Sequence, residues 1–281
     1  MRTLSASIVA YRDSVPVLKR AISSFLESAP NSVLYLIDNS PTDVLRHIVS
    51  SPHVVYVHCR KNIGFGAAHN IALRHAMRQS TYHLVLNPDV YFDPEVIPEL
   101  LGFMDGHPDV GLVMPRVLNP DGSLQPLCRL LPTPWTLIAR NFFPPLAERE
   151  NYTYELRFTD YRQLLDVPFL SGCFMFLRMS ALEQTGLFDE RYFLYGEDLD
   201  LCRRIHRHTR TVYYPDAVIY HDRQKTGNRF FHKVFNLSRY FSKWGWLYDE
   251  ERQQINDRLL NAQINVCELE SENFSEGRVP G

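Results

Sequence analysis

Two acidic segments of this sequence contain residue types that could bind a metal ion and remove a proton. In LNPDV, residues 86–90, Asp89 with Asn87 nearby offers the oxygen ligands that a hard divalent cation binds when a diphosphate supplies the rest. Such a cation would neutralise a leaving diphosphate. Glu197 and Asp198 stand at the start of a predicted helix, where carboxylates are favoured in the ionised form that a general base requires. Each segment also has a purely structural interpretation, as a capped turn or as carboxylates that complement a helix dipole.

Two loops could line a nucleotide site. IDNSPTD, residues 37–43, places Asp38 directly after a predicted strand, where a carboxylate can accept hydrogen bonds from a nucleobase or a ribose. In NIGFGAAHN, residues 62–70, Gly64 and Gly66 would let the backbone approach a ligand closely, and the next helix would point its N-terminus at the same region. The alternatives are an Asx-turn that caps a helix and an ordinary glycine turn. The glycine loop matches neither the dinucleotide fingerprint nor the P-loop.

These candidate residues lie at the ends of elements in an alternating α/β order. Short apolar runs predict strands at 4–10, 33–37, 54–58, 82–86, 110–114, 169–177 and 211–220, and helical spacing predicts helices between most of the early ones. This order predicts a mostly parallel sheet flanked by helices, with ligands bound at the carboxyl ends of the strands. His221, directly after the last strand, could bind a metal ion or a phosphate oxygen, although a single histidine suits many roles.

Two later segments depart from this order. Residues 115–170 are rich in proline and weakly periodic, which predicts an irregular insertion near a substrate site or a loosely ordered flap. Arg129, Arg140 and Trp135 within it could touch a sugar or a phosphate, or could be surface residues. Residues 229–246 predict an amphipathic helix whose apolar face holds Phe230, Val234, Leu237, Phe241 and Trp244, opposite Arg229, Lys233 and Lys243. This helix could rest on an anionic inner-membrane surface, or its apolar face could pack on the catalytic core or on a second subunit.

Composition excludes several classes of protein. The chain of 281 residues has a formal net charge of -2, which does not indicate a nucleic-acid-binding protein. Its five cysteines are scattered and form no C-x-x-C pair, which argues against a disulfide framework or a zinc site and indicates a reducing compartment. No stretch reaches roughly 18 apolar residues, and the first residues read as a strand, so neither a transmembrane helix nor a signal peptide is predicted. We expect one cytoplasmic catalytic domain with additions.

In their order and spacing, these segments resemble the family-2 inverting glycosyltransferases of the GT-A fold. Within that family the chain is most similar to the bacterial rhamnosyltransferases of O-antigen, lipopolysaccharide and related polysaccharide biosynthesis. The resemblance runs from residue 3 to about residue 222 and rests on SIVAY at 7–11, Asp38-Asn39-Ser40, NIGFGAAHN at 62–70, LNPDV at 86–90, SGCFMFLR at 171–178, GLFDERYFLYGEDLDLC at 186–202, and His221. It implies a GT-A catalytic domain over 1–222, with a nucleotide-binding half to about 115 and an acceptor-side half from 116, and a C-terminal helical extension over 223–281.

The resemblance also implies a role for each candidate residue. These roles are donor nucleotide binding for Tyr11, Asp38, Asn62, Gly64, Asn70 and Asn87, metal binding for Asp89 and His221, catalysis for Asp198 with Glu197, and an acceptor-side position for Gly172. Glu197 would support the acceptor or orient Asp198. The cofactor implied is Mg²⁺ or Mn²⁺, with Asp89 as the main ligand because Asn87 replaces the first carboxylate of the family's D-x-D element. The family's early Tyr-Asn is Tyr11-Arg12 here, which changes the contacts expected from that loop.

The implied reaction is a single displacement. Asp198 takes a proton from an acceptor hydroxyl, and the oxygen attacks the anomeric carbon from the face opposite the diphosphate. The implied donor is the nucleotide sugar dTDP-L-rhamnose. The implied acceptor is a surface-polysaccharide glycan, which in this class is often lipid-linked and faces the cytoplasm. The sequence is compatible with an oligomer.

Other functions fit parts of the same sequence. A UDP- or GDP-sugar donor would keep the fold and the site. A nucleotidyltransferase would need an early glycine-rich triphosphate loop, and the first βα loop, YRDSVPVLK, has no glycine. A non-catalytic nucleotide-sugar sensor or scaffold would need a broken site, for which Asn87 is the support. The intact Glu197, Asp198 and His221 oppose that last interpretation.

Overall fold

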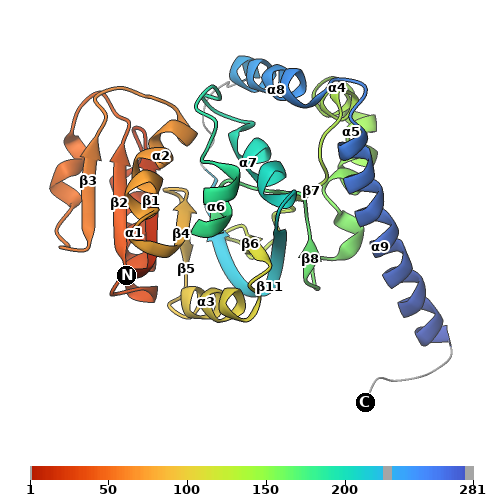
Figure 1. The fold of residues 1–281 in the computed structure, drawn as a ribbon, viewed down its shortest axis with the longest axis horizontal. Coiled ribbons are helices and arrows are strands. Elements are labelled where there is room, and N and C mark those ends of the chain that lie inside the picture. The colour runs from red at the N-terminus through yellow and green to blue at the C-terminus, as the bar shows by residue number, and fades with distance from the viewer. Residues whose placement is uncertain (1, 224–229, 276–281) are drawn as a thin grey trace.

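The chain folds around one mixed β-sheet to which both early and late segments contribute. The computed structural model describes residues 2–223 and 230–275. The nine-stranded sheet has the order β3-β2-β1-β4-β10-β6-β11-β5, with β8 beside β11 (Figure 1). Its strands are β1 (Arg2–Ala10), β2 (Val33–Asp38), β3 (Val54–His58), β4 (Ser80–Leu86), β5 (Val90–Phe92), β6 (Val110–Leu118), β8 (Leu165–Asp166), β10 (Phe174–Arg178) and β11 (Arg210–His221).

The main strands of the sheet run in one direction. β1 pairs in parallel with β2 and β4, β2 with β3, and β6 with β11. β10 is antiparallel to both β4 and β6, so the two parallel groups point the same way. Their carboxyl ends therefore meet at one edge of the sheet. The predicted fold class, a mostly parallel sheet flanked by helices, is confirmed.

Helices connect the strands and pack on the sheet. They are α1 (Val15–Ser28), α2 (Phe65–Ala76), α3 (Val96–Gly106), α4 (Pro134–Phe142), α5 (Pro144–Tyr154), α6 (Met179–Thr185), α7 (Glu197–His206), α8 (Phe230–Trp244) and α9 (Glu250–Ser275), with short 3-10 helices η1 (Val44–Ile48) and η2 (Arg157–Thr159). α1 packs with α3, whereas α7 contacts both α2 and α6. A Cβ at Gly66 would lie 3.5 Å from the Cβ of Glu197, so the N-terminus of α7 lies next to the start of α2.

The segment 115–170 is more regular than its composition predicts. It contains the end of β6, helices α4 and α5, and the strands β7 (Cys128–Arg129) and β9 (Phe169–Leu170), which form a separate two-stranded ribbon. Proline begins these helices rather than breaking them, because a proline in the first turn has no hydrogen bond to lose. Thr133 caps α4 by accepting a hydrogen bond of 3.0 Å from the Thr136 N–H. The expectation of an irregular insertion was therefore wrong for α4 and α5.

The apolar run at 169–177 is two strands rather than one. β9 ends at Leu170 and pairs with β7, while β10 begins at Phe174 and joins the main sheet. The turn between them, which includes Gly172, lets the chain pass from the ribbon to the sheet. The predicted strand at 211–220 is part of β11.

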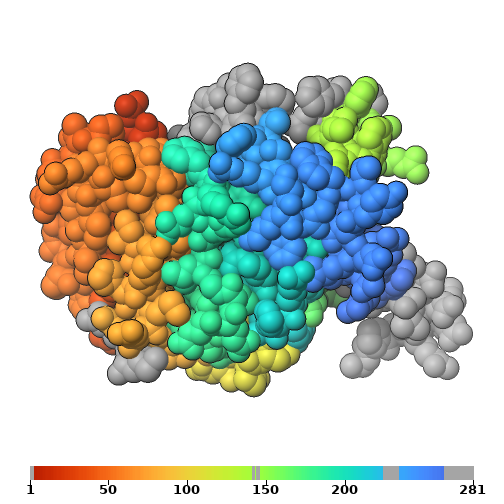
Figure 2. All heavy atoms as spheres, turned by 45° about the horizontal axis from the view of Figure 1, so that its top comes forward, coloured from red at the N-terminus to blue at the C-terminus, as the bar shows by residue number. Residues whose placement is uncertain are grey.

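The C-terminal segment that contains α8 and the start of α9 contacts α7 through ion pairs and a stacked tryptophan. Arg203 on α7 is almost fully buried and pairs with Asp249 and Glu251, each at 2.6 Å. Trp244 of α8 lies below two guanidinium groups, at 4.3 Å from Arg203 and 4.4 Å from Arg207. In Figure 2 the C-terminal segment, drawn in blue, lies directly against the green and teal segment that contains α7. The orientation of α7 therefore depends on residues late in the chain.

The predicted amphipathic helix corresponds to α8. Leu237, Phe241 and Trp244 pack on the core, and Phe241 is 2% exposed. This supports the core-packing alternative for that part of the face. Val234 and Phe235 are exposed, and the side chains of residues 229–233 lie outside the described residues. Within residues 2–223 and 230–275, no helix is long and apolar enough to cross a membrane.

Candidate active site

Polar residues gather where the parallel strands end. At this edge lie Asp38 at the end of β2, Asn87 and Asp89 after β4, and His221 at the end of β11. The turn before β10 reaches the same edge, because β10 runs antiparallel to β4. The topology thus brings together residues that the sequence separates widely.

Asp89 and His221 form a close pair at this edge. The Nε2 atom of His221 lies 3.2 Å from Oδ1 of Asp89. On the other side of the ring, Nδ1 lies 3.1 Å from Oε1 of Gln125, whose Nε2 donates to the His221 carbonyl at 2.7 Å. Burial alone lowers the pKa of His221, but Cys173 and Asp89 outweigh it and raise the pKa to about 10. The imidazole is therefore held facing Asp89. Gln125 was absent from the predicted site because its contact with His221 spans 96 residues and has no local sequence signal.

The Asp89–His221 pair can be compared with the needs of a divalent cation. Among the residues that the structure describes, no three His, Cys, Asp or Glu side chains converge as a complete metal site would require. Neighbouring ligands of an octahedral ion with bonds of about 2.1 Å lie about 3 Å apart, close to the 3.2 Å between Asp89 and His221. The pair fits a cation that displaces the proton shared by His221 and Asp89 and takes its remaining ligands from a diphosphate and from water. Asn87, partly buried beside the pair, donates its backbone N–H to the Cys173 carbonyl at 2.9 Å.

Asp198 is fixed in the first turn of α7 by two backbone N–H groups. Its Oδ2 accepts a hydrogen bond of 3.1 Å from Gly172, and its Oδ1 accepts one of 2.9 Å from Leu199. A Cβ at position 172 would lie 3.1 Å from the Asp198 Cβ, so a larger residue there would push against the carboxylate. Burial raises the pKa of Asp198 above its ordinary value, and the two N–H groups and the charge of Arg129 offset only part of this rise. These contacts fix the carboxylate and favour its ionised form, as a general base requires.

Glu197 is enclosed more completely than its neighbour. It is 4% exposed, and within the described part of the chain its Oε2 atom is buried without a hydrogen-bond partner. Burial, followed by the charge of Asp198, raises the pKa of Glu197 to about 8. A place at the helix N-terminus predicted an ionised carboxylate, but the cost of burying the charge is larger here. Glu197 therefore keeps its proton at neutral pH, and Asp198 is the better base.

Asp38 forms the Asx-turn that the sequence allowed. Its Oδ1 accepts the Ser40 N–H at 2.8 Å, and its Oδ2 accepts the Tyr56 hydroxyl at 2.7 Å. Burial and the neighbouring carboxylate raise the pKa of Tyr56, so its hydroxyl stays a donor. Asp38 is fully buried by these contacts. A contact between Asp38 and a nucleobase or ribose stays a prediction.

The two predicted nucleotide loops are joined to each other. The side-chain amide of Asn39 donates to Oδ1 of Asn62 at 3.3 Å and to the Gly64 carbonyl at 3.1 Å. The same Asn62 oxygen accepts the Gly64 N–H at 3.0 Å. Tyr11, at the end of β1, is 37% exposed and donates its backbone N–H to Asp13. The Arg12 N–H donates to the Ser40 hydroxyl at 3.1 Å, so the loops after β1, β2 and β3 form one continuous rim.

The glycine loop packs against the segment that leads into α7. Gly64 has a φ of +96°, and a Cβ there would lie 2.6 Å from the Phe193 carbonyl oxygen. The amide of Asn70 donates at 2.9 Å to both the Phe188 carbonyl and Glu190, and accepts the Phe188 N–H at 3.1 Å. The close approach expected for a ligand is therefore made by the protein's own backbone. The nucleotide-binding role of Asn70 stays a prediction.

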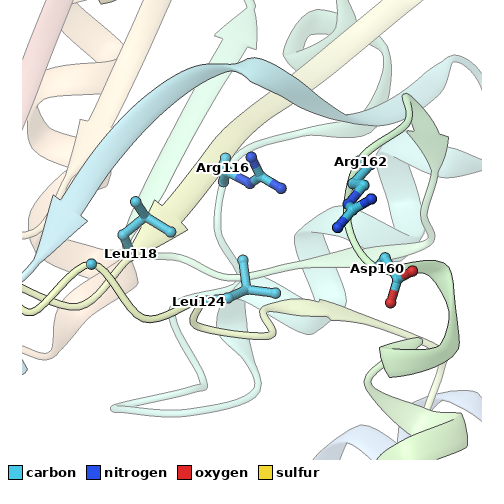
Figure 3. A pocket seen from close by; sticks show the side chains of 6 residues that line it. Arg116, Leu118, Leu124, Asp160 and Arg162 are labelled. Atoms are coloured by element: carbon cyan, nitrogen blue, oxygen red, sulfur yellow. The ribbon is translucent and has the colours of Figure 1, made fainter.

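A separate cavity of about 400 Å³ lies at the carboxyl end of β6. In Figure 3 the side chains of Arg116 and Arg162 extend into the same space, above Leu124 and Asp160. Tyr161 lies between this cavity and β7. Its carbonyl accepts a hydrogen bond of 3.1 Å from the Arg116 side chain, and its hydroxyl forms hydrogen bonds of 3.2 Å with the backbone of Cys128. The cavity is therefore distinct from the surface of β7 that carries Arg129.

The fold is shared with solved glycosyltransferase structures. The crystal structure of GalNAc-T7 with UDP, GalNAc and Mn²⁺ superposes with a TM-score of 0.63 at 15% identity, covering 86% of this chain and 48% of that one. The S. aureus TarS structure gives a TM-score of 0.58 at 16% identity, covering 92% of this chain and 43% of TarS. The chain thus spans about half the length of these structures. A GT-A fold, with polar residues at the carboxyl edge of its sheet, is the class that these features define.

Sequence comparison identifies the family. Residues 5–186 match glycosyl transferase family 2. The N-acetylglucosaminyl-diphospho-decaprenol L-rhamnosyltransferase of Mycobacterium tuberculosis is 32% identical over 233 residues, 75% of this chain and 74% of that protein. The low-salt glycan biosynthesis hexosyltransferase of Haloferax volcanii is 28% identical over 212 residues, 73% of this chain and 62% of that protein. The chain belongs to glycosyl transferase family 2 and is a glycosyltransferase that resembles rhamnosyltransferases.

Proposed function

We propose that this glycosyltransferase moves L-rhamnose from dTDP-L-rhamnose to a lipid-linked glycan in the cytoplasm, with inversion and with the aid of a divalent cation. One observation carries the proposal above all others. Asp198, a carboxylate fixed by two backbone N–H groups, lies at the same sheet edge as the Asp89–His221 pair. The mycobacterial relative, named as an L-rhamnosyltransferase that acts on a diphospho-decaprenol, supports the choice of sugar and of acceptor class.

The site residues would divide the reaction between them. Asp198 would accept the proton of an acceptor hydroxyl, and that oxygen would attack the anomeric carbon opposite the leaving diphosphate. Glu197, protonated and buried beside it, would limit the movement of Asp198. Asp89 and His221 would hold Mg²⁺ or Mn²⁺, which when bound neutralises charge on the diphosphate. The Mn²⁺ in the GalNAc-T7 structure supports this metal class.

The loops around Asp38 would receive the nucleotide. Tyr11 is the exposed aromatic residue on this rim, and the joined pair of Asn39 and Asn62 stabilises its shape. We assign donor binding to Tyr11, Asp38, Asn62, Gly64 and Asn87, with Asn70 acting through the loop that it holds. The division into a catalytic part at 1–222 and a helical extension at 223–281 likewise stays a proposal.

Peripheral contact with the inner-membrane surface would bring the enzyme to a lipid-linked acceptor. Such contact would use Val234 and Phe235, which are exposed apolar side chains in the described part of α8, at 50% and 57% accessibility. Aspartate at both positions should remove cosedimentation with anionic liposomes without lowering the thermal midpoint. Retained cosedimentation would contradict membrane contact through α8.

A thermal-shift panel with dTDP, UDP, GDP and CMP, each with and without Mn²⁺, tests the proposed function. A ligand that binds only the folded state stabilises it by about 2.7 kcal/mol at a hundredfold excess over Kd. A metal-dependent shift with dTDP would support the rhamnosyl donor. A shift with UDP or GDP alone would keep the glycosyltransferase and replace the donor, whereas no shift with any nucleotide would contradict nucleotide-sugar binding.

A further inference from the structure

Arg129 is a cation that acts on the proposed base Asp198 through its charge but makes no close ion pair within the described residues. It ends β7, and its guanidinium lies over the Phe169 ring at 5.4 Å. Its Nε atom is buried without a hydrogen-bond partner, and no carboxylate in the described residues pairs with it. Burying part of a guanidinium without an anion is costly. A polar group left unsatisfied in this way indicates a missing partner, such as a ligand or an ion.

Arg140 adds a second guanidinium on the same segment, with one buried nitrogen that has no hydrogen-bond partner. Arg140, on α4, donates to Glu155 at 2.8 Å and lies over the Tyr154 ring at 4.6 Å. Its Nη1 atom is buried and has no hydrogen-bond partner in the part of the chain described. Glu155 is shared with Arg157, which donates to it at 2.6 and 2.9 Å. One buried carboxylate, Glu155, therefore accepts hydrogen bonds from two arginines, and within the described residues it makes none with Arg129.

This cationic surface borders the carboxylate assigned as the base. Tyr154 connects the two arginines: its ring lies under Arg140 at 4.6 Å, and its carbonyl accepts the N–H of Leu130, the residue after Arg129, at 3.0 Å. Burial raises the pKa of Tyr154 most, the charges of Arg129 and Arg140 lower it, and that of Asp198 raises it. The path of the backbone also places Arg129 near Asp198. β7 pairs with β9, and β9 runs into the turn whose Gly172 N–H binds Asp198. A ligand held by these arginines would therefore lie beside the acceptor hydroxyl.

We propose that Arg129, together with Arg140, binds a phosphate group of the acceptor. This inference rests on the proposed function, in which the acceptor is a sugar linked to a lipid through a diphosphate. On such an acceptor the phosphate oxygens lie within one sugar ring of the attacking hydroxyl, and a guanidinium can bind them through two parallel N–H groups. The donor's diphosphate is a second source of the same chemistry, but the proposed site for it is the Asp89–His221 pair.

A comparison of two acceptors that carry the same sugar shows whether Arg129 binds the acceptor's phosphate or the donor's diphosphate. One is N-acetylglucosamine linked to a short diphospho-polyprenol, and the other is a neutral alkyl glycoside of N-acetylglucosamine. Arg129→Ala should lower the ratio of kcat/KM for the first acceptor over the second by about ten- to a hundredfold, because a charge-assisted hydrogen bond is lost. Arg129→Lys should lower this ratio less, since lysine keeps the positive charge but cannot bind two phosphate oxygens through parallel N–H groups. Arg162→Ala, in the cavity beside β6, is the matched control and should leave the ratio unchanged.

Several outcomes would overturn the inference. An unchanged acceptor ratio in folded Arg129→Ala would do so, and so would a rise in the donor KM alone, which would assign Arg129 to the donor's diphosphate. Should Arg129→Ala fail to fold, Arg129→Lys supplies the ratio. If the wild-type protein transfers no sugar and binds no nucleotide, the proposed function fails instead. In that case, calorimetry with inorganic diphosphate tests the proposed phosphate site at Arg129 directly. Arg129→Lys should weaken diphosphate binding at least about threefold, and Arg162→Ala should leave it unchanged.

Discussion

The indole N–H of Trp244 donates a hydrogen bond of 2.8 Å to Oδ1 of Asp200. Asp200 is fully buried and lies in the same helical turn as Asp198, so α8 is tied to the element that carries the proposed base. Lys243 approaches the same oxygen at 2.7 Å, and Arg204 binds the other at 2.9 Å. Asp200 thus connects α7 to α8 through contacts with Trp244 and Lys243.

Replacing Trp244 with phenylalanine tests this connection. The change keeps an aromatic ring but removes the donor to a buried carboxylate, which should lower the free energy of unfolding by about 1–2 kcal/mol. Urea denaturation of both proteins measures the difference. Trp246→Phe is the matched control, because Trp246 is 48% exposed and should tolerate the change. Equal losses in both variants would show that the hydrogen bond to Asp200 contributes little.

The buried proton of Glu197 should make stability depend on pH. The folded protein holds this proton up to about pH 8, whereas the unfolded chain releases it near the ordinary value of 4.5. The stabilising effect is therefore complete below pH 4.5 and is lost as pH rises through about 8. Glu197→Gln, a neutral mimic, should gain stability over the wild type as pH rises from 5 to 9. Thermal midpoints across this range, with exposed Glu183→Gln as control, measure the effect. A difference that does not change with pH would contradict a protonated Glu197.

The nucleotide half of the fold was predictable because its signals are local. The strands β1 to β4 are short apolar runs bounded by turn residues, and burial of both faces leaves β2 without polar positions before Asp38. Helices α4 and α5 were missed because their segment is rich in proline and weakly periodic, although its prolines at 134 and 144–145 stand in first turns, where a helix tolerates them. The short strand β5 was missed because three residues carry too little periodicity to detect.

The sequence allowed us to predict which residues belong to the candidate site better than which residues contact one another. Asp89 and His221 do approach each other, although a sequence pattern contains no information about their distance. Gly64 was expected to make room for a ligand, but the structure shows that it makes room for the Phe193 carbonyl. Gln125 had no local signal as a site residue, because its contact with His221 spans 96 residues. Arg129 was a candidate for a sugar or phosphate contact, but its residue type alone did not distinguish it from a surface residue.

Asp198→Asn distinguishes a catalyst from a nucleotide-sugar sensor. The amide keeps the size of the side chain but cannot accept the hydroxyl proton, so transfer should fall by about 10²- to 10⁴-fold. The thermal shift with donor nucleotide should persist, because Asp198 lies on the acceptor side of the site. Radiolabelled sugar transfer and the nucleotide shift are measured on the same preparation. Activity that survives the substitution would require another base, and a simultaneous loss of nucleotide binding would indicate a structural role for Asp198.

Asp89→Asn should separate metal binding from nucleotide binding. The substitution preserves the shape of the side chain but removes the charge that an Mn²⁺ ion would meet, while His221 alone makes a weak site. We expect the metal-dependent part of the dTDP affinity to fall at least about tenfold, which removes about 1.4 kcal/mol of ligand-induced stabilisation at saturating nucleotide. The shift without metal should remain. Asp93→Asn, an exposed carboxylate four residues along, is the control. A wild-type metal dependence in Asp89→Asn would remove Asp89 from the proposed metal site.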